Sequence, residues 1–87
     1  MARRIFVHVN SDIDIGGFMM PKAIRWKDGR IFNIETVTDF RPANSLAGRL
    51  PGDCYTVVIG GKTKYLYFER SGSRVPGCFG RWFVLVG

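Results

Sequence analysis

Hydrophobic residues recur at alternate positions in short runs along this chain, and a period of two predicts β-strands. In residues 4–10, Ile5, Val7 and Val9 occupy one face, which is wholly aliphatic and is expected to face the core. Five further runs are rich in β-branched and aromatic residues: 22–26, 30–37, 53–59, 62–70 and 81–86. The pattern therefore predicts an all-β chain.

Glycine-marked turns divide these runs into hairpins. The pair Gly60-Gly61 separates residues 53–59 from residues 62–70 and is typical of a two-residue turn. Such a turn puts Tyr55, Val57, Ile59, Leu66 and Phe68 on one face, and Thr56, Val58, Thr63, Tyr65 and Tyr67 on the other. Both faces are partly apolar, so this hairpin is either covered on both sides or presents an aromatic face to a partner.

The register of the first hairpin, around Asp28-Gly29, follows from the same alternation. A two-residue turn would leave Phe32 on the face opposite Ile24. A three-residue loop at residues 27–29, with Gly29 left-handed, instead pairs Ile24 with Phe32. It gathers Ile24, Trp26, Phe32 and Ile34 on one side, and we favour it for that reason.

The remaining segments shape the expected architecture. Residues 11–17, 41–52 and 71–80 read as loops, with a helical turn possible at residues 44–50. Beyond Glu35 the apolar positions change parity, so a bulge near Glu35 or Thr36 is expected to curl the sheet. We therefore predict one domain, residues 1–87, folded as a small antiparallel barrel or roll of five to six strands.

Length and composition fit a compact binding module. Eighty-seven residues form one modest core, and 46% apolar with 23% charged residues is an ordinary globular mixture. The apolar run after the basic N-terminus is too short for a signal peptide, and no stretch approaches the roughly 20 apolar residues of a membrane span. We expect a cytoplasmic protein without membrane contact, in which Cys54 and Cys78 are buried thiols rather than a disulfide.

The net charge of +6 introduces nucleic acid as a possible ligand. Lys62, Lys64, Tyr65 and Tyr67 on the second hairpin are the best candidates, because lysine neutralises phosphates and tyrosine stacks on bases. Further charges come from Arg3, Arg4, Arg25 and Lys27. In the alternative interpretation the lysines are merely solvated and the tyrosines pack with their hydroxyls at the rim.

The run Phe6-Val7-His8-Val9 is similar to the second nucleic-acid-binding motif of cold-shock domains. The similarity covers only these residues, and no strand like Lys-Gly-Phe-Gly-Phe precedes them. We therefore do not assign the chain to that family.

The residues used in catalysis and metal binding are scattered. His8, Cys54 and Cys78 lack the spacings of zinc ligands, and Asp12 and Asp14 lack the later acidic ligands of a calcium loop. With a single histidine, the other carboxylates form no evident acid and base pair. The sequence predicts no metal, no cofactor and no enzymatic activity.

Several segments resemble a family of small uncharacterised bacterial proteins. In the first half these are residues 24–30 (IRWKDGR), Ile34, Val37, Asp39 and Arg41. In the second half they are residues 52–59 (GDCYTVVI), 65–69 (YLYFE) and 80–84 (GRWFV). The resemblance implies a shared small β-fold, because its motifs are hairpin and core residues, and it carries over no activity, cofactor or catalytic position.

We therefore expect a non-enzymatic barrel of SH3-like type that binds a ligand through an aromatic and basic sheet face. A protein partner, or a second copy of the chain, is the leading hypothesis, and single-stranded RNA or DNA is the alternative. The candidate binding residues are Arg25, Trp26, Lys62, Lys64, Tyr65 and Tyr67, with Trp82 as a further exposed aromatic if it points outward.

Overall fold

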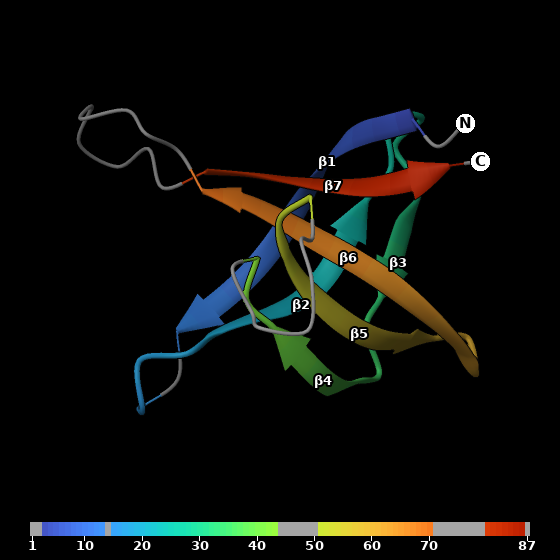
Figure 1. The fold of residues 1–87 in the computed structure, drawn as a ribbon. Helices are drawn as coiled ribbons and strands as arrows, with labels where there is room; N and C mark the ends of the chain where they lie inside the picture. Colours follow the sequence, from blue (N-terminus) through green and yellow to red (C-terminus); the bar gives the residue numbers. More distant parts are fainter. Residues whose placement is uncertain (1–2, 14, 44–50, 71–79, 87) are drawn as a thin grey trace.

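The computed structural model describes residues 3–13, 15–43, 51–70 and 80–86, and these residues form strands and turns without a helix (Figure 1). The strands are β1 (Arg3–Ile13), β2 (Met19–Arg25), β3 (Ile31–Asn33), β4 (Thr36–Arg41), β5 (Asp53–Ile59), β6 (Lys62–Arg70) and β7 (Gly80–Val86). The all-β prediction is confirmed. The helical turn considered at residues 44–50 and the loop at residues 71–79 lie outside the described residues.

All strand pairs are antiparallel, and the sheet curls into a half-barrel with the order β3-β2-β1-β7-β6-β5-β4. β1 belongs to both parts of this sheet. Its first half pairs with β7, from Arg3 opposite Val86 to Val7 opposite Trp82. Its second half pairs with β2, with an irregularity between Asn10 and Ser11. β1 and β7 thus connect the first hairpin to the second, because β1 pairs with β2 and β7 pairs with β6.

The expected third strand, residues 30–37, is divided in two. Ile34 and Glu35 separate β3 from β4, and their backbone N–H groups point to different parts of the sheet. Ile34 donates to the Lys22 carbonyl at 2.9 Å, whereas Glu35 donates to the Val58 carbonyl at 2.8 Å. This link carries the chain from one end of the strand order to the other, so the expected bend is a full break and the described strands number seven.

β1 and β2 are longer than the sequence predicted. Residues 11–13 were expected in a loop because of Asp12, yet Asp12 lies opposite Met20 in the β1–β2 ladder. The prediction was wrong at these residues, because cross-strand pairing with Met19 and Met20 outweighs the low strand propensity of Asp12.

The first hairpin has the predicted three-residue loop. Ile24 lies opposite Phe32, and Arg25 lies opposite Ile31. The Trp26 N–H donates to the Arg30 carbonyl at 2.8 Å, and Gly29 has a φ of 94°, in the left-handed region that favours glycine. The register prediction is confirmed.

The second hairpin has the predicted two-residue turn. Ile59 lies opposite Lys62, and the φ angles of Gly60 and Gly61 are 58° and 76°. Two successive positive φ angles define the type I′ turn, whose twist matches that of the flanking strands. The predicted division of this hairpin into two faces is therefore confirmed.

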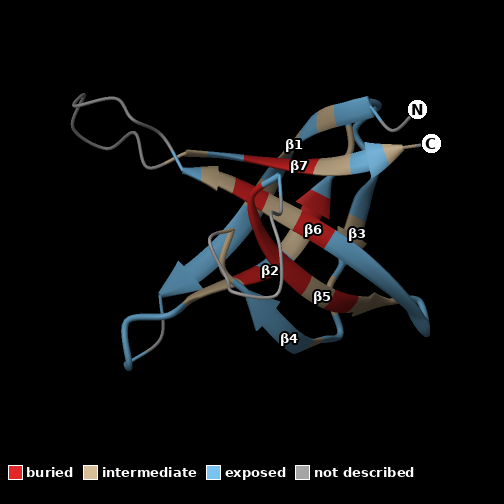
Figure 2. Cartoon of the chain, in the orientation of Figure 1, coloured by how far each residue is buried: buried red, intermediate tan, exposed pale blue. Residues whose placement is uncertain are grey.

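The core lies on the inner face of the half-barrel, and β2, β5, β6 and β7 each contain buried residues (Figure 2). Its buried members are Ile24, Tyr55, Val57, Leu66, Phe68 and Trp82, and Val7 and Val9 pack against them. Trp82 therefore points inward, with ring centroids 4.9 Å from Phe68 and 5.3 Å from Tyr55. The prediction that the aliphatic face of β1 meets the core is confirmed for Val7 and Val9, whereas Ile5 is half-buried and is not part of the core cluster.

A smaller apolar cluster covers part of the outer face. The Phe83 ring is fully buried there and stacks on Tyr67 at 5.3 Å, while Phe6 meets its edge at 5.8 Å. Cys54, a free and buried thiol, lies opposite Tyr67 in the ladder. The second hairpin is thus partly covered on both sides, and Cys78 lies outside the described residues.

Candidate functional site

A cavity of about 560 Å³ opens at the end of the inner face where the two hairpins approach each other. The first hairpin contributes Ile24, Trp26, Arg30 and Phe32; β5 and β6 contribute Val57, Ile59, Thr63, Lys64, Tyr65 and Tyr67; and β7 contributes Val84 and Leu85. Aliphatic and aromatic residues dominate the wall. A concave, largely apolar site of this size is typical of ligand-binding pockets.

The charged residues that line this cavity are both cations. Lys64 lies opposite Val57, a core residue with no exposed surface, and cross-strand partners share a face. The lysine side chain therefore leaves the sheet on the inner side. Arg30 follows the turn of the first hairpin, and its guanidinium lies 5.6 Å from the centroid of the Phe32 ring. Lys64 and Arg30 are thus the charged groups of the cavity wall, and Arg30 is paired with an aspartate of its own turn.

Arg30 is held by the turn that precedes it. Its Nε donates to Asp28 Oδ2 at 2.6 Å, and its backbone N–H donates to Asp28 Oδ1 at 3.0 Å. The backbone hydrogen bond is the largest cause that lowers the pKa of the Asp28 carboxyl, and the guanidinium adds to it. Asp28 is thus an ionised partner that fixes the direction of Arg30.

The structure brings four of the predicted binding residues to this cavity and leaves two outside it. Trp26, Lys64, Tyr65 and Tyr67 all contribute to the wall. Lys62 lies opposite Ile59, beside the turn, and is not part of the lining. Arg25 lies opposite Ile31 and His8, next to Trp26 in the chain but on the outer side of β2.

Strand alternation also separates the lysines from the tyrosines of β6. Lys62 and Lys64 project from the inner side of the sheet, whereas Tyr65 and Tyr67 alternate to the outer side. The Tyr67 ring accordingly stacks on Phe83 of the outer cluster. Lys64, Tyr65 and Tyr67 thus all border the cavity, but the lysine and the two tyrosines project from opposite sides of β6 and do not form one surface.

Sequence reasoning missed Arg30, Phe32 and Val84 as site residues. Phe32 and Val84 belong to β3 and β7, which do not pair with each other, and both line the cavity because the sheet curls. A local signal for Arg30 was present, since an aspartate two residues earlier in a tight turn can accept from both its backbone and its side chain.

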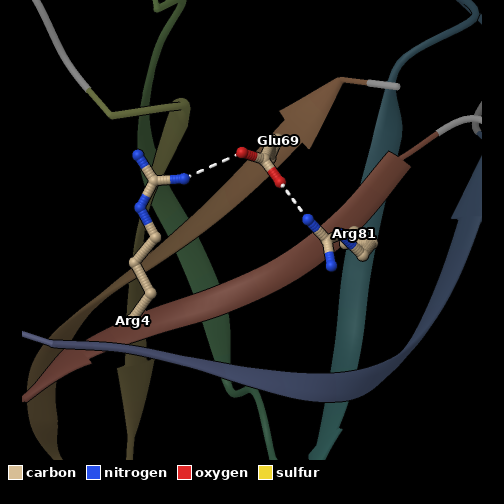
Figure 3. A network of polar contacts seen from close by, with 3 residues as sticks. All are labelled: Arg4, Glu69 and Arg81. Atoms are coloured by element: carbon tan, nitrogen blue, oxygen red, sulfur yellow. Dashed lines mark hydrogen bonds and ion pairs between the residues drawn. The ribbon is translucent and has the colours of Figure 1, made fainter. Parts of the chain in front are cut away.

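The outer face carries a second charged and aromatic arrangement. Glu69 accepts hydrogen bonds from Arg4 Nη1 at 2.8 Å and from Arg81 Nη2 at 2.9 Å (Figure 3). These hydrogen bonds, first that of Arg81 and then that of Arg4, lower the pKa of the Glu69 carboxyl. One carboxylate therefore holds two arginines from β1 and β7.

Both arginines also lie on aromatic rings. The Arg4 guanidinium is 4.7 Å from the centroid of Phe83, and that of Arg81 is 4.1 Å from the centroid of Phe6. The Phe6 side remains accessible, since this residue is 42% exposed. Cation–π contacts of this kind fix the rings and the charges relative to each other.

The side chains that commonly bind metals are dispersed over the part of the chain that the structure describes. Within residues 3–13, 15–43, 51–70 and 80–86, no group of three or more His, Cys, Asp or Glu side chains is placed to hold a metal ion. These residues also include no helix that could cross a membrane.

Comparison of the chain with protein-family models, with curated proteins and with solved structures finds no match in any of the three. Membership of the family of small bacterial proteins therefore stays a prediction. The proposals below rest on the geometry of the cavity and of the outer face.

Proposed function

We propose that this protein is a non-enzymatic, cytoplasmic interaction module of SH3-like barrel type, which binds an acidic segment of another protein. An apolar side chain of that segment enters the cavity at the end of the half-barrel. The observation that supports this proposal most is the cavity itself, whose wall is apolar and aromatic and whose charged lining residues, Arg30 and Lys64, are both cationic.

An acidic partner is better supported than a second copy of the chain. Each copy carries a net charge of +6, so two copies repel each other. Most of the described carboxylates, moreover, are already paired with arginines of the same chain: Asp28, Asp39, Asp53 and Glu69. A second copy therefore has little free negative charge to offer to Arg30 and Lys64.

The energetics match a module that binds through one anchor. Full burial of a leucine or phenylalanine side chain contributes about 1.5–3 kcal/mol. Rim charges contribute mainly to the association rate and to the choice of partner. We therefore expect the apolar anchor to determine the lifetime of the complex. The association rate should depend on the salt concentration.

Selection from a random peptide display library tests the proposal. The enriched peptides are expected to share one apolar residue flanked by Asp or Glu, and to bind Trp26→Ala at least tenfold more weakly, by about 1.4 kcal/mol. Ile31→Ala is the matched control, because Ile31 belongs to the same hairpin but is 63% exposed and does not line the cavity. No enrichment, or equal binding by Trp26→Ala, would count against the proposal.

Single-stranded nucleic acid is a second candidate ligand, supported by a different observation. Phe6 is partly exposed on the outer face, with the Arg81 guanidinium on its ring and Arg25 opposite the neighbouring His8. Exposed aromatics beside arginines are typical of surfaces on which bases stack. This candidate predicts a salt-sensitive rise in the fluorescence anisotropy of a labelled mixed-sequence oligonucleotide, and Phe6→Leu should abolish that rise.

A further inference from the structure

Arg30 is constrained more tightly than its exposed position requires. Its side chain is 66% exposed, yet its backbone N–H and its Nε both donate to Asp28, and its guanidinium lies against the Phe32 ring. The two terminal nitrogens of the guanidinium have no hydrogen-bond partner among the described residues. Arg30 therefore presents an oriented pair of donors at the edge of an apolar cavity.

Such an arrangement suits a carboxylate better than a general negative charge. Arginine binds a carboxylate through two parallel hydrogen bonds, and a guanidinium that is already oriented loses less conformational entropy when it does so. The net charge of the Asp28 and Arg30 pair is zero, so simple Coulomb attraction to this pair is weak. Arg30 therefore differs from a freely solvated arginine in the fixed orientation of its guanidinium and not in its charge.

Lys64 supplies a second cation on a different strand of the same wall. A chain terminus offers one carboxylate, whereas acidic side chains on both sides of an anchor residue offer one to each cation. The positions of these cations in the two hairpins therefore favour Asp or Glu side chains within a segment over a chain terminus.

We infer that Arg30 is a specificity residue of the cavity, which binds an Asp or Glu side chain next to the apolar anchor of the bound segment, and that Asp28 is the positioning residue that holds Arg30 for it. This inference deepens the proposed function and rests on it. It identifies the ligand as a segment with one apolar side chain between acidic ones.

Two acetylated and amidated peptides test the inference by isothermal titration. Each has a central leucine, flanked on both sides by two glutamates in one peptide and by two glutamines in the other. The glutamate peptide is expected to bind about tenfold more tightly, because one hydrogen-bonded pair of charged groups contributes a difference of this size. Arg30→Gln and Arg30→Lys should both lower this ratio severalfold, since lysine keeps the charge but loses the paired donors, and Lys64 accounts for the preference that remains.

Asp28→Ala distinguishes the positioning of Arg30 from simple charge attraction, because the two predict opposite changes in the preference for the glutamate peptide. Removal of this carboxylate makes the rim more positive, so attraction by charge alone predicts tighter binding of the glutamate peptide. Loss of positioning predicts a lower ratio between the two peptides. Thermal unfolding of each variant verifies that the exposed substitutions leave the fold intact.

The outcomes separate the two proposals. If neither peptide binds, the proposed function fails; if both bind equally to the unmodified protein, only the inference about Arg30 fails. Tighter binding by Asp28→Ala would overturn the positioning role.

A glutamine peptide with a free terminal carboxylate that matches the glutamate peptide would overturn the assignment to acidic side chains. Arg30-dependent binding of a single-stranded oligonucleotide in place of either peptide would transfer the site to nucleic acid.

Discussion

The guanidinium of Arg81 lies on the ring of Phe6, with its Cζ atom 4.1 Å from the ring centroid. The two residues belong to β7 and β1, close to Val7 and Trp82, where the pairing of these strands ends. Phe6 lies within the paired region and Arg81 just beyond it, so their contact is a diagonal one across the last backbone pair.

This contact should be measurable as a coupling between the two side chains. In a double-mutant cycle with Phe6→Leu and Arg81→Gln, we expect a coupling free energy of about 0.5–1 kcal/mol, the usual size of an exposed cation–π pair. Urea unfolding of the four proteins provides the measurement. Strict additivity of the two substitutions would contradict the expectation.

Glu69 should titrate below its ordinary pKa of 4.5, because Arg81 and Arg4 stabilise its ionised form. A folded-state pKa lower than the unfolded value means that this carboxylate stabilises the fold above pH 4.5. The contribution is lost as the pH falls through the folded-state pKa. Carbon-detected NMR titration should show a larger upward shift of this pKa in Arg81→Gln than in Arg4→Gln, because Arg81 is the larger cause.

Asp53 should be the most important carboxylate for stability. It is 5% exposed, and it accepts from the Ala43 N–H at 3.0 Å and from Arg70 Nε at 2.9 Å. Asp53→Ala leaves a part-buried N–H without its acceptor, so we expect a loss of about 2–3 kcal/mol in the free energy of unfolding.

Asp39→Ala is the control for that substitution, because Asp39 forms a comparable ion pair with Arg41 but is exposed. Exposed ion pairs contribute between about 0 and 1 kcal/mol. Equal losses in the two variants, measured by chemical denaturation, would contradict the role given to Asp53.

Gly80 should tolerate no side chain. A Cβ atom at this position would overlap the Glu69 carbonyl oxygen and lie 2.6 Å from Cζ of Phe68, a core residue. We expect Gly80→Ala to lower the melting temperature markedly, because the backbone of β6 or the ring of Phe68 must move. Gly17→Ala has a positive φ but open space around it, so it should cost only about 1 kcal/mol of backbone strain.

Cys54 should react slowly with thiol reagents. Burial raises the pKa of its thiol above the ordinary value of 9.0, which lowers the fraction of the reactive thiolate at neutral pH. In a Cys78→Ser variant, alkylation of Cys54 is expected to follow the unfolding rate and to accelerate in urea. Rapid alkylation of the folded protein would show that the thiol is accessible.

The two hairpins could be predicted from the sequence because the information that defines them is local. Gly29 and the parity of Ile24 and Phe32 select the loop of the first hairpin, and Gly60-Gly61 selects the turn of the second. In both cases a shift of one residue would move the apolar side chains to the wrong face.

The break at Ile34 and Glu35 could be located but not interpreted. The change of parity showed that the strand is irregular there, yet a bulge and a change of sheet partner have the same local pattern. The two N–H groups donate to the carbonyls of Lys22 and Val58. This choice of acceptors depends on how the whole sheet curls.

The candidate site was predicted only in part, because some of its residues have a local signal and others are brought together by contacts between the hairpins. Trp26 and Lys64 are recognisable as an aromatic and a basic residue near hairpin turns, and the structure brings both to the cavity wall. Their approach to Phe32 and Val84 depends on contacts between the hairpins, which no local pattern encodes. The separation of Lys64 from Tyr65 follows from strand alternation, although composition alone had grouped them.

The pairing of β1 with β7 has a consequence for the order in which the fold is acquired. Each hairpin can form as soon as its own residues are available, but Arg3 and Val86 are separated by almost the whole chain. Closure of such a long loop is entropically costly and slow, and it delays the step that completes the sheet. During translation, the first half of β1 therefore leaves the ribosome with its backbone edge unpaired and Phe6 uncovered, and this segment stays available to chaperones until β7 arrives.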